Sequence, residues 1–412
     1  MVPSDGYRAR PFSDAAAAID VDVVVATDHA PPLATEMEDR LVVVDFDRPE
    51  ASAARIAALA EREPVDAVVG IDDQGVLTAA HASELLGLPH NPPDAVAATR
   101  NKVDMRGVFA AWSIPQPEFR VIHPGSDTAM LAAEVGFPCV VKPVSLSAGT
   151  GVIRADTADQ AVAAERRVRE ILTSHNRPRE EPLLVEGFVE GAEVSLEGLM
   201  VEGRLEVLAI FDKPDPLDGP YFEETIYVTP SRLPPAVSGA VVAAVASGCA
   251  ALGLREGPVH AEVRVGDDVD GTRPTWVLEI AARSIGGLCS RVLSFGAGVS
   301  LEELILRRAL GLPTEGLASS GGASGVMMIP IPRTGILADV EGVDAARAVP
   351  GIVDVEITAT RGRRIEALPE GGRYLGFVFA RGDTPAEVEQ ALRDAHAALD
   401  IVISAEGRDD PR

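Results

Sequence analysis

Apolar segments and helical patterns alternate along roughly the first hundred residues, and this alternation constrains the fold more than any other feature of the sequence. It predicts strands at 21–27, 41–46 and 65–70, and helices at 50–63 and 76–88. Continuous apolar strands separated by helices are typical of a parallel sheet that is covered on both faces. The sequence therefore predicts a doubly wound α/β unit at its N-terminal end.

The first strand expected of such a unit is either very short or missing from the start of this sequence. The stretch "MVPSDGY" offers at most two apolar residues before a turn, and a helical pattern follows it. We therefore expect that the N-terminal sheet lacks a full-length first strand.

The rest of the chain predicts two further units. Residues 193–213 and 257–281 each show strand patterns around a glycine-containing turn, which is typical of antiparallel hairpins. A connector rich in Gly and Ser at 317–325 precedes a last unit, whose final helix has Thr384 and Glu387 placed as a capping box. The predicted domains are 1–95, doubly wound and Rossmann-like; 96–316, mixed α and β; and 317–412, a small α/β domain.

Charge and cysteine content narrow the environment and the partners. The formal net charge of −26 argues against nucleic acid and against an anionic membrane surface, but not against a local phosphate site. The uncharged segment 238–254 is short for a membrane span and is expected to be a helix buried on a sheet. Cys139, Cys249 and Cys289 have apolar or small neighbours and no C-x-x-C spacing, which indicates packed thiols in a reducing, cytoplasmic compartment.

Lysine is rare enough in this chain for its positions to carry information. Lys102, Lys142 and Lys213 are the three lysines among 37 basic residues, so arginine supplies the other 34. Lysine places a compact charge on a single phosphate oxygen, whereas arginine prefers planar bidentate partners. Lys102 and Lys142, with the loop "SLSAGTG" after the second, suit a nucleotide phosphate chain. The alternative is that three lysines survived by chance.

Two pairs of glutamates have the pattern expected of a binding site. Glu186 ends an apolar strand, where it could accept from an adenine amino group, and Glu193 could bind a ribose diol; either could equally be a solvated loop charge. Glu262 and Glu279 lie on the two strands of one predicted hairpin. Facing carboxylates repel each other unless a cation lies between them, which indicates Mg²⁺, with unrelated outward-facing glutamates as the alternative. Arg283, beside "IGG", offers a guanidinium to an anion.

Together these motifs resemble the ATP-grasp ligases over most of residues 20–404. The matching stretches occur in order: "NKVDMR", "GFPCVVKPVSLSAGTGV", "LLVEGFVEGAEVSLEG", "HAEVRV" and "LEIAARSIGG". Within that superfamily the chain most resembles bacterial L-amino-acid ligases, because of "EIAAR", "DKPDP" with "YFEETIYVTPS", and "RYLGFVFARGDTPAEVEQAL". The resemblance implies an ATP-grasp fold with an N-terminal Rossmann-like domain, an ATP-clamping domain and a C-terminal α/β domain.

The resemblance also implies a role for each matching residue. Lys142 and Arg283 would be catalytic, and Glu262 and Glu279 would ligate Mg²⁺ or Mn²⁺. The residues implied to bind ATP are Lys102, Lys142, Ser147, Gly149, Gly151, Glu186, Gly187, Phe188, Val189 and Glu193. The residues implied to bind substrate are Lys213, Glu224, Tyr227, Arg283, Gly286 and Gly287.

Three positions depart from patterns found in the superfamily. Many ATP-grasp enzymes have an Asn metal contact where this chain has Ala281. In this respect the chain resembles the amino-acid ligase branch. Tyr227 replaces a His of some relatives, which leaves the amine specificity open. The phosphate loop has two glycines, Gly149 and Gly151, fewer than in biotin carboxylase-like enzymes.

The implied reaction joins a carboxylate to an amine, with an amino acid expected as substrate and a homodimer compatible with it. The carboxylate would attack the γ-phosphorus of ATP to give an acyl-phosphate and ADP, and the amine would then displace phosphate to form an amide. Residues 145–151 would close over the water-labile acyl-phosphate. Two alternatives are a bicarbonate-activating carboxylase and a nucleotide-binding sensor without turnover.

Overall fold

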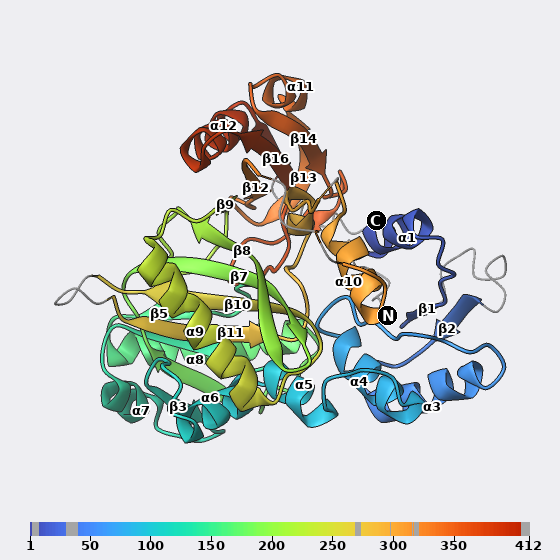
Figure 1. Cartoon of the computed structure of the whole chain (residues 1–412). Helices are drawn as coiled ribbons and strands as arrows, with labels where there is room; N and C mark the ends of the chain where they lie inside the picture. Colours follow the sequence, from blue (N-terminus) through green and yellow to red (C-terminus); the bar gives the residue numbers. More distant parts are fainter. Residues whose placement is uncertain are drawn as a thin grey trace, which may run out of the picture.

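The computed structural model describes residues 1, 8–29, 40–267, 273–296, 298–314, 316 and 321–404. Figure 1 shows an N-terminal unit beside two central sheets, with the C-terminal helices and strands above them. The chain is of mixed α/β class, as predicted.

A two-stranded parallel sheet with helices around it forms the described part of the N-terminal unit. Its elements are β1 (Val25–Thr27), β2 (Leu41–Val43), α1 (Ala9–Ala18), α3 (Pro49–Ala60) and α4 (Gly75–Leu86). Parallel pairing of β1 with β2 confirms the predicted strand direction. The expected lack of a full-length first strand concerns the residues before Tyr7, and residues 2–7 lie outside the described residues.

The predicted strand at 65–70 is wrong, although the structure describes that whole segment. It has no regular strand, and its described backbone contacts go to the chain terminus instead. The Met1 ammonium donates to the Val69 carbonyl at 2.6 Å, and the Ile71 N–H donates to the Met1 carbonyl at 3.2 Å. An apolar run predicts burial here, but one residue of pairing is too short for a ladder.

A four-stranded antiparallel sheet carries the first part of the central unit. Its order is β3 (Phe119–Ile122), β6 (Leu183–Gly187), β4 (Cys139–Pro143) and β5 (Ile153–Ala155). Helices α7 (Thr128–Val135) and α8 (Ala158–Ser174) contact these strands, and their apolar residues form one core with them. In the antiparallel register of β4 and β6, Lys142 lies opposite Leu184 and Val140 lies opposite Glu186, so Lys142 and Glu186 are diagonal neighbours on one face of the sheet.

The second central sheet has eight strands. Their order is β11 (Thr275–Ala281), β10 (Gly257–Val265), β7 (Ala192–Val201), β8 (Arg204–Lys213), β9 (Ile226–Thr229), β12 (Ala323–Ile329), β16 (Gly376–Gly382) and β14 (Ile352–Ile357). Pairing of β7 with β8 and of β10 with β11 confirms both predicted hairpins. The β9–β12 pair continues the sheet across the predicted domain boundary at 317, so the last three strands extend the central sheet.

Three helices pack near β10 and β11 of the eight-stranded sheet. These helices are α5 (Pro93–Arg100), α6 (Lys102–Ala111) and α9 (Pro235–Leu252), and they pack with β10 and β11 around one apolar core. Helix α9 is the one described helix long and apolar enough to cross a membrane, by length and composition alone. It contacts β8, β10 and β11, as predicted for a helix on a sheet.

A three-stranded sheet and two helices complete the C-terminal part. The sheet order is β15 (Arg364–Ile365), β13 (Gly335–Glu341) and β17 (Asp400–Ser404). Helices α11 (Val343–Arg347) and α12 (Pro385–Ala397) contact each other, and both contact β14 of the eight-stranded sheet. Thr384 and Glu387 form the predicted capping box at the start of α12. Cys139, Cys249 and Cys289 are buried free thiols, as predicted.

Candidate functional site

A cavity of about 480 Å³ lies where the three parts of the chain meet. The predicted site residues that line it are Lys102, Lys142, Ser147, Gly149, Glu186, Gly187, Phe188, Val189, Glu193, Glu224, Tyr227, Glu262, Glu279, Arg283, Gly286 and Gly287. Gly151 and Lys213 are also described, but they do not line the cavity. The fold thus brings to one cavity residues that lie up to 185 positions apart in the sequence, from Lys102 to Gly287.

Two cations hold the carboxylate of Glu186. The Arg106 Nε atom donates to Glu186 Oε1 at 2.7 Å, and the Lys142 Nζ atom lies 2.6 Å from Glu186 Oε2. Burial alone would raise the pKa of Glu186, but Arg106 and Lys142 lower it to about 2. The side chain predicted to meet adenine is therefore already engaged. Arg106 was missed, although it lies inside the "NKVDMR" motif.

Lys102 enters the cavity from the first turn of α6. Asn101 caps this helix by accepting the N–H groups of Val103 and Asp104, which fixes where the helix begins. The Lys102 Nζ atom donates to the Leu146 carbonyl at 2.9 Å and lies 3.3 Å from Glu279 Oε2. Lys102 therefore joins the predicted phosphate loop to a predicted metal ligand.

The predicted phosphate loop contacts the C-terminal part of the chain. Gly149 lines the cavity with φ +71°, and a Cβ there would lie 2.8 Å from the Phe222 carbonyl oxygen. Gly151 faces away from the cavity, and its N–H donates to the Pro369 carbonyl at 2.9 Å. The Thr150 hydroxyl donates to the Gly371 carbonyl at 3.1 Å. The loop predicted to close is thus held by the segment 366–374 in this structure.

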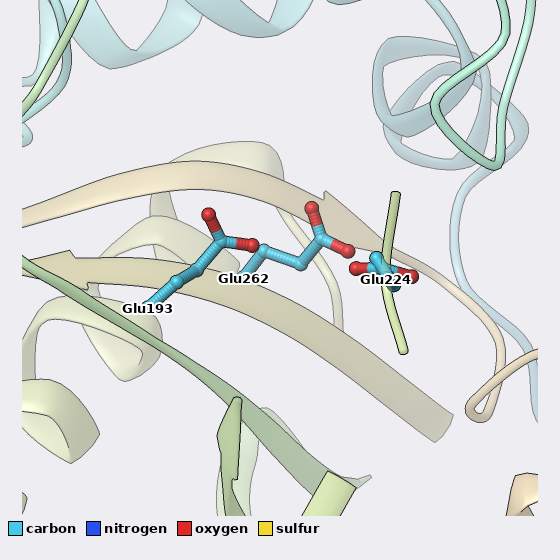
Figure 2. A group of neighbouring side chains, drawn as sticks. All are labelled: Glu193, Glu224 and Glu262. Atoms are coloured by element: carbon cyan, nitrogen blue, oxygen red, sulfur yellow. The ribbon is translucent and has the colours of Figure 1, made fainter. Parts of the chain in front are cut away.

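Three carboxylates gather around one ammonium group. The nearest oxygens of Glu193, Glu224 and Glu262 lie within 4.8 Å of one another, and Figure 2 shows these side chains converging. Lys213 Nζ lies 2.7 Å from Glu193 and 3.3 Å from Glu262, and it also bonds Glu224. Glu193, predicted to bind ribose, additionally accepts from Arg264 Nε at 2.8 Å. The cluster is therefore a largely buried ion-pair network, in which Lys213 contacts all three carboxylates and Arg264 adds a second cation at Glu193.

Burial sets the protonation of the substrate side of this cluster. It raises the pKa of Glu224 to about 7, against the opposing effect of Lys213. Tyr227 is buried beside it, with Lys213 Nζ 5.1 Å from its ring centroid. A carboxyl that titrates near neutrality can exchange a proton with an amine.

The predicted metal pair lies on one face of the β10–β11 hairpin. Glu262 and Glu279 are directly opposed in the antiparallel register, so their side chains point to the same side. Both line the cavity, and an all-oxygen donor set suits a hard cation such as Mg²⁺. The residues fit the ion, although both carboxylates contact lysine here. Their metal role stays a prediction.

Arg283 faces the N-terminal unit. Its Nε donates to Asp73 Oδ1 at 2.8 Å, and burial, which lowers the pKa of this guanidinium, is outweighed by Asp73, so the pKa lies above its ordinary value. Asp72 and Arg8 line the cavity nearby. Sequence reasoning missed Asp72, Asp73 and Arg8, because no motif marks them. Asp73 and Arg8 have partners 210 and 276 residues away, at Arg283 and Ser284.

Two cation–π contacts flank Phe188 in the irregular segment that follows β6. The Phe188 ring has Arg154 4.6 Å and Arg264 5.4 Å from its centroid. Gly187 and Val189 line the cavity on either side of it. Such an apolar, backbone-exposing segment can receive a planar base.

Family comparisons agree with this geometry. The ATP-grasp N-terminal domain family matches residues 13–90, the ATP-grasp domain family matches 135–292, and L-amino acid ligase C-terminal domain 2 matches 327–404.

Individual relatives extend the likeness. The chain is 28% identical over 279 residues to alanine–anticapsin ligase of Bacillus subtilis, which is 64% of this chain and 58% of that protein. It is 30% identical over 177 residues to a D-alanine–D-alanine ligase of Aromatoleum aromaticum, covering 42% and 54%. The matched region thus spans less than two thirds of either relative.

Solved structures show the same fold. An L-amino acid ligase from Bacillus licheniformis superposes with a TM-score of 0.78 at 26% identity, covering 95% of both chains. A carboxyaminoimidazole ribonucleotide synthase from Aspergillus clavatus, complexed with ATP, gives 0.72 at 18% identity, covering 95% of this chain and 96% of that one. The second likeness concerns the fold alone.

Proposed function

Because the chain is an ATP-grasp protein that resembles L-amino-acid ligases, we propose that it is an ATP-dependent carboxylate–amine ligase. One observation carries the proposal: Lys102, Lys142 and Arg283 converge on the same cavity as Glu262 and Glu279. Cations aimed at transferring phosphoryl oxygens, beside carboxylates that suit Mg²⁺, are the components that phosphoryl transfer requires. The substrates would be small carboxylates and amines, with an amino acid on at least one side.

ATP would bind between the two central sheets. Lys142 has three N–H donors, so it can keep Glu186 and still reach a phosphate oxygen. Phe188 and the backbone around it would meet the adenine. Glu193 can accept from a ribose hydroxyl only while it also holds Lys213 and Arg264.

The chemistry would run in two steps. A substrate carboxylate oxygen attacks the γ-phosphorus and ADP leaves, which gives an acyl-phosphate. The amine then attacks the acyl carbon and phosphate leaves with the bonding electron pair, which forms the amide. Mg²⁺, held by Glu262 and Glu279, would supply charge neutralisation on the phosphates.

Arg283 and Glu224 would serve the reacting atoms directly. A guanidinium can hold two oxygens of the transferring phosphoryl group at once, and its charge matters most in the transition state. Glu224, with its pKa of about 7, would accept a proton from the attacking ammonium near neutral pH. The reaction would take place in the cytoplasm, where the three thiols stay reduced.

The test is ADP and phosphate release from Mg-ATP across a panel of L-amino acids, singly and in pairs, with products identified by mass. Amino-acid-dependent release with formation of an amide supports the ligase. Release that depends on bicarbonate would indicate a carboxylase. Nucleotide binding without release under any condition would indicate a sensor.

A further inference from the structure

The peptide group between Ser284 and Ile285 is gripped from both sides by buried charges. On one side the Ile285 N–H donates to both carboxylate oxygens of Glu197, each at 3.0 Å. On the other side Arg8 NH1 donates to the Ser284 carbonyl at 3.3 Å, and Arg8 NH2 donates to the Ser284 hydroxyl. Ser284 and Ile285 are themselves 1% exposed. One peptide unit therefore has a carboxylate at its N–H and a guanidinium at its C=O.

Both gripping residues are buried, and packing or a further bond restrains each. Glu197 lies on β7 and is 0% exposed, and its cross-strand neighbour His260 contacts it through Nδ1 at 3.2 Å. Arg8 is 5% exposed, contacts the Phe12 ring and donates to the Ile71 carbonyl at 2.6 Å. A buried charge costs free energy unless it is well paired. Burial of both Glu197 and Arg8 at one peptide therefore indicates that they have a specific role there.

The gripped peptide lies between residues that face the cavity. Arg283 precedes it and Gly286 and Gly287 follow it, and all three line the cavity. The Ser284 carbonyl also accepts from Arg283 NH1 at 3.1 Å. A shift of this peptide would therefore move the guanidinium and the two glycine amides together.

We propose that Glu197 and Arg8 are positioning residues, which fix the Ser284–Ile285 peptide and thereby aim Arg283 at the transferring group. This inference rests on the proposed function for the identity of that group. Glu197 sets the position from the central sheet, and Arg8 sets it from the N-terminal unit. Arg8 also holds Ile71, which precedes Asp72 and Asp73, so one side chain fixes the spacing between the two walls of the cavity.

The first test is a double-mutant cycle with Glu197→Gln and Arg283→Lys. Glutamine keeps one acceptor but loses the charge and the two-oxygen acceptance, so ADP release should fall about tenfold, the value of one charge-assisted hydrogen bond. Nucleotide affinity should stay within a few-fold. Since Glu197 acts through Arg283, adding Glu197→Gln to Arg283→Lys should lower release by less than about twofold. Equal losses in both backgrounds would overturn the inference.

Arg8→Lys provides a second variant, because lysine ends in a single nitrogen. It cannot reproduce contacts made from two terminal nitrogens, of which one bonds the Ile71 and Ser284 carbonyls and the other bonds the Ser284 hydroxyl. This variant should show the same dependence on Arg283. The matched control is Glu165→Gln: Glu165 is a half-buried carboxylate on α8 that accepts from Arg169 Nε at 2.8 Å, and it contacts neither this peptide nor Arg8. The control should change ADP release equally in both backgrounds or not at all.

Hydrogen–deuterium exchange separates this inference from the proposed function. Amides of residues 284–287 should exchange about tenfold faster in Glu197→Gln than in the unsubstituted protein, because the Ile285 N–H loses part of its acceptor. Glu165→Gln should leave them unchanged. Unaltered exchange in Glu197→Gln overturns the inference, whether or not the protein releases ADP. If the unsubstituted protein releases no ADP while exchange responds as expected, only the proposed function fails.

Discussion

Replacing Glu186 with glutamine should destabilise the folded chain by about 3 kcal/mol at pH 7. Arg106 and Lys142 are buried against this carboxylate and would be left without its charge. The pKa of Glu186 falls from 4.5 to about 2, which corresponds to about 3 kcal/mol at about 1.4 kcal/mol for each tenfold change in proton affinity. That value agrees with the cost of about 3–5 kcal/mol for breaking a buried ion pair.

The stabilisation of the fold by the Glu186 carboxylate should depend on pH. The folded pKa is depressed, so the stabilisation is complete above about 4.5 and is lost as pH falls towards about 2. The difference in unfolding free energy between the unsubstituted protein and Glu186→Gln should therefore hold from pH 7 to about 4.5 and shrink below it. Urea unfolding of the nucleotide-free protein measures this difference.

A matched control and a clear contrary result are available. Glu206 pairs with Arg308 at 2.7 Å, but both are more than a third exposed, so Glu206→Gln should cost under about 1 kcal/mol. If Glu186→Gln costs no more than Glu206→Gln at pH 7, or if its cost does not change below pH 4.5, the ion pair does not stabilise the fold as argued.

Three further outcomes are expected. Arg283→Lys should keep nucleotide affinity within a few-fold but lower ADP release by roughly 10²–10³, whereas Lys142→Ala should also weaken ATP binding, as nucleotide titration beside turnover would show. Gly149→Ala should weaken ATP binding at least about tenfold by titration, because its Cβ would meet the Phe222 carbonyl, while Gly125→Ala, with φ +82° and open space, should bind normally. Thr384→Ala should cost about 0.5–2 kcal/mol in urea unfolding without changing turnover, since it removes only a helix cap.

Local sequence patterns predicted the elements well where the elements are set by near neighbours. Strand alternation around a turn located both hairpins, and the spacing of Thr384 and Glu387 located the start of α12. The segment 65–70 failed because an apolar run reports burial and cannot report whether a partner strand is long enough. Pairing of β9 with β12 was likewise not predictable, since it joins two distant edges.

The site residues also differ in whether local sequence patterns or distant contacts determine their place. Residues inside motifs, such as Lys102 and Glu279, could be placed at the cavity from their spacing, whereas Asp73 and Arg8 could not. Each of these two has its partner in a segment far along the chain, and neither position has a residue type that is unusual for a surface. Charge pairs across domains follow from topology, which a single sequence does not display.

Lys142 and Lys213 indicate two different reasons why an arginine-rich chain keeps lysine. Glu186 is held by one arginine and one lysine: Arg106 is 1% exposed, while Lys142 reaches the cavity wall. At Glu193 the two residue types exchange places: the arginine, Arg264, lines the cavity, whereas the lysine, Lys213, does not. Lys213 meets three carboxylates with three N–H donors that diverge, and a planar guanidinium has no such geometry. We therefore propose that position 142 keeps lysine because a slim single charge can reach a phosphate oxygen, and that position 213 keeps it because its donors diverge towards three carboxylates.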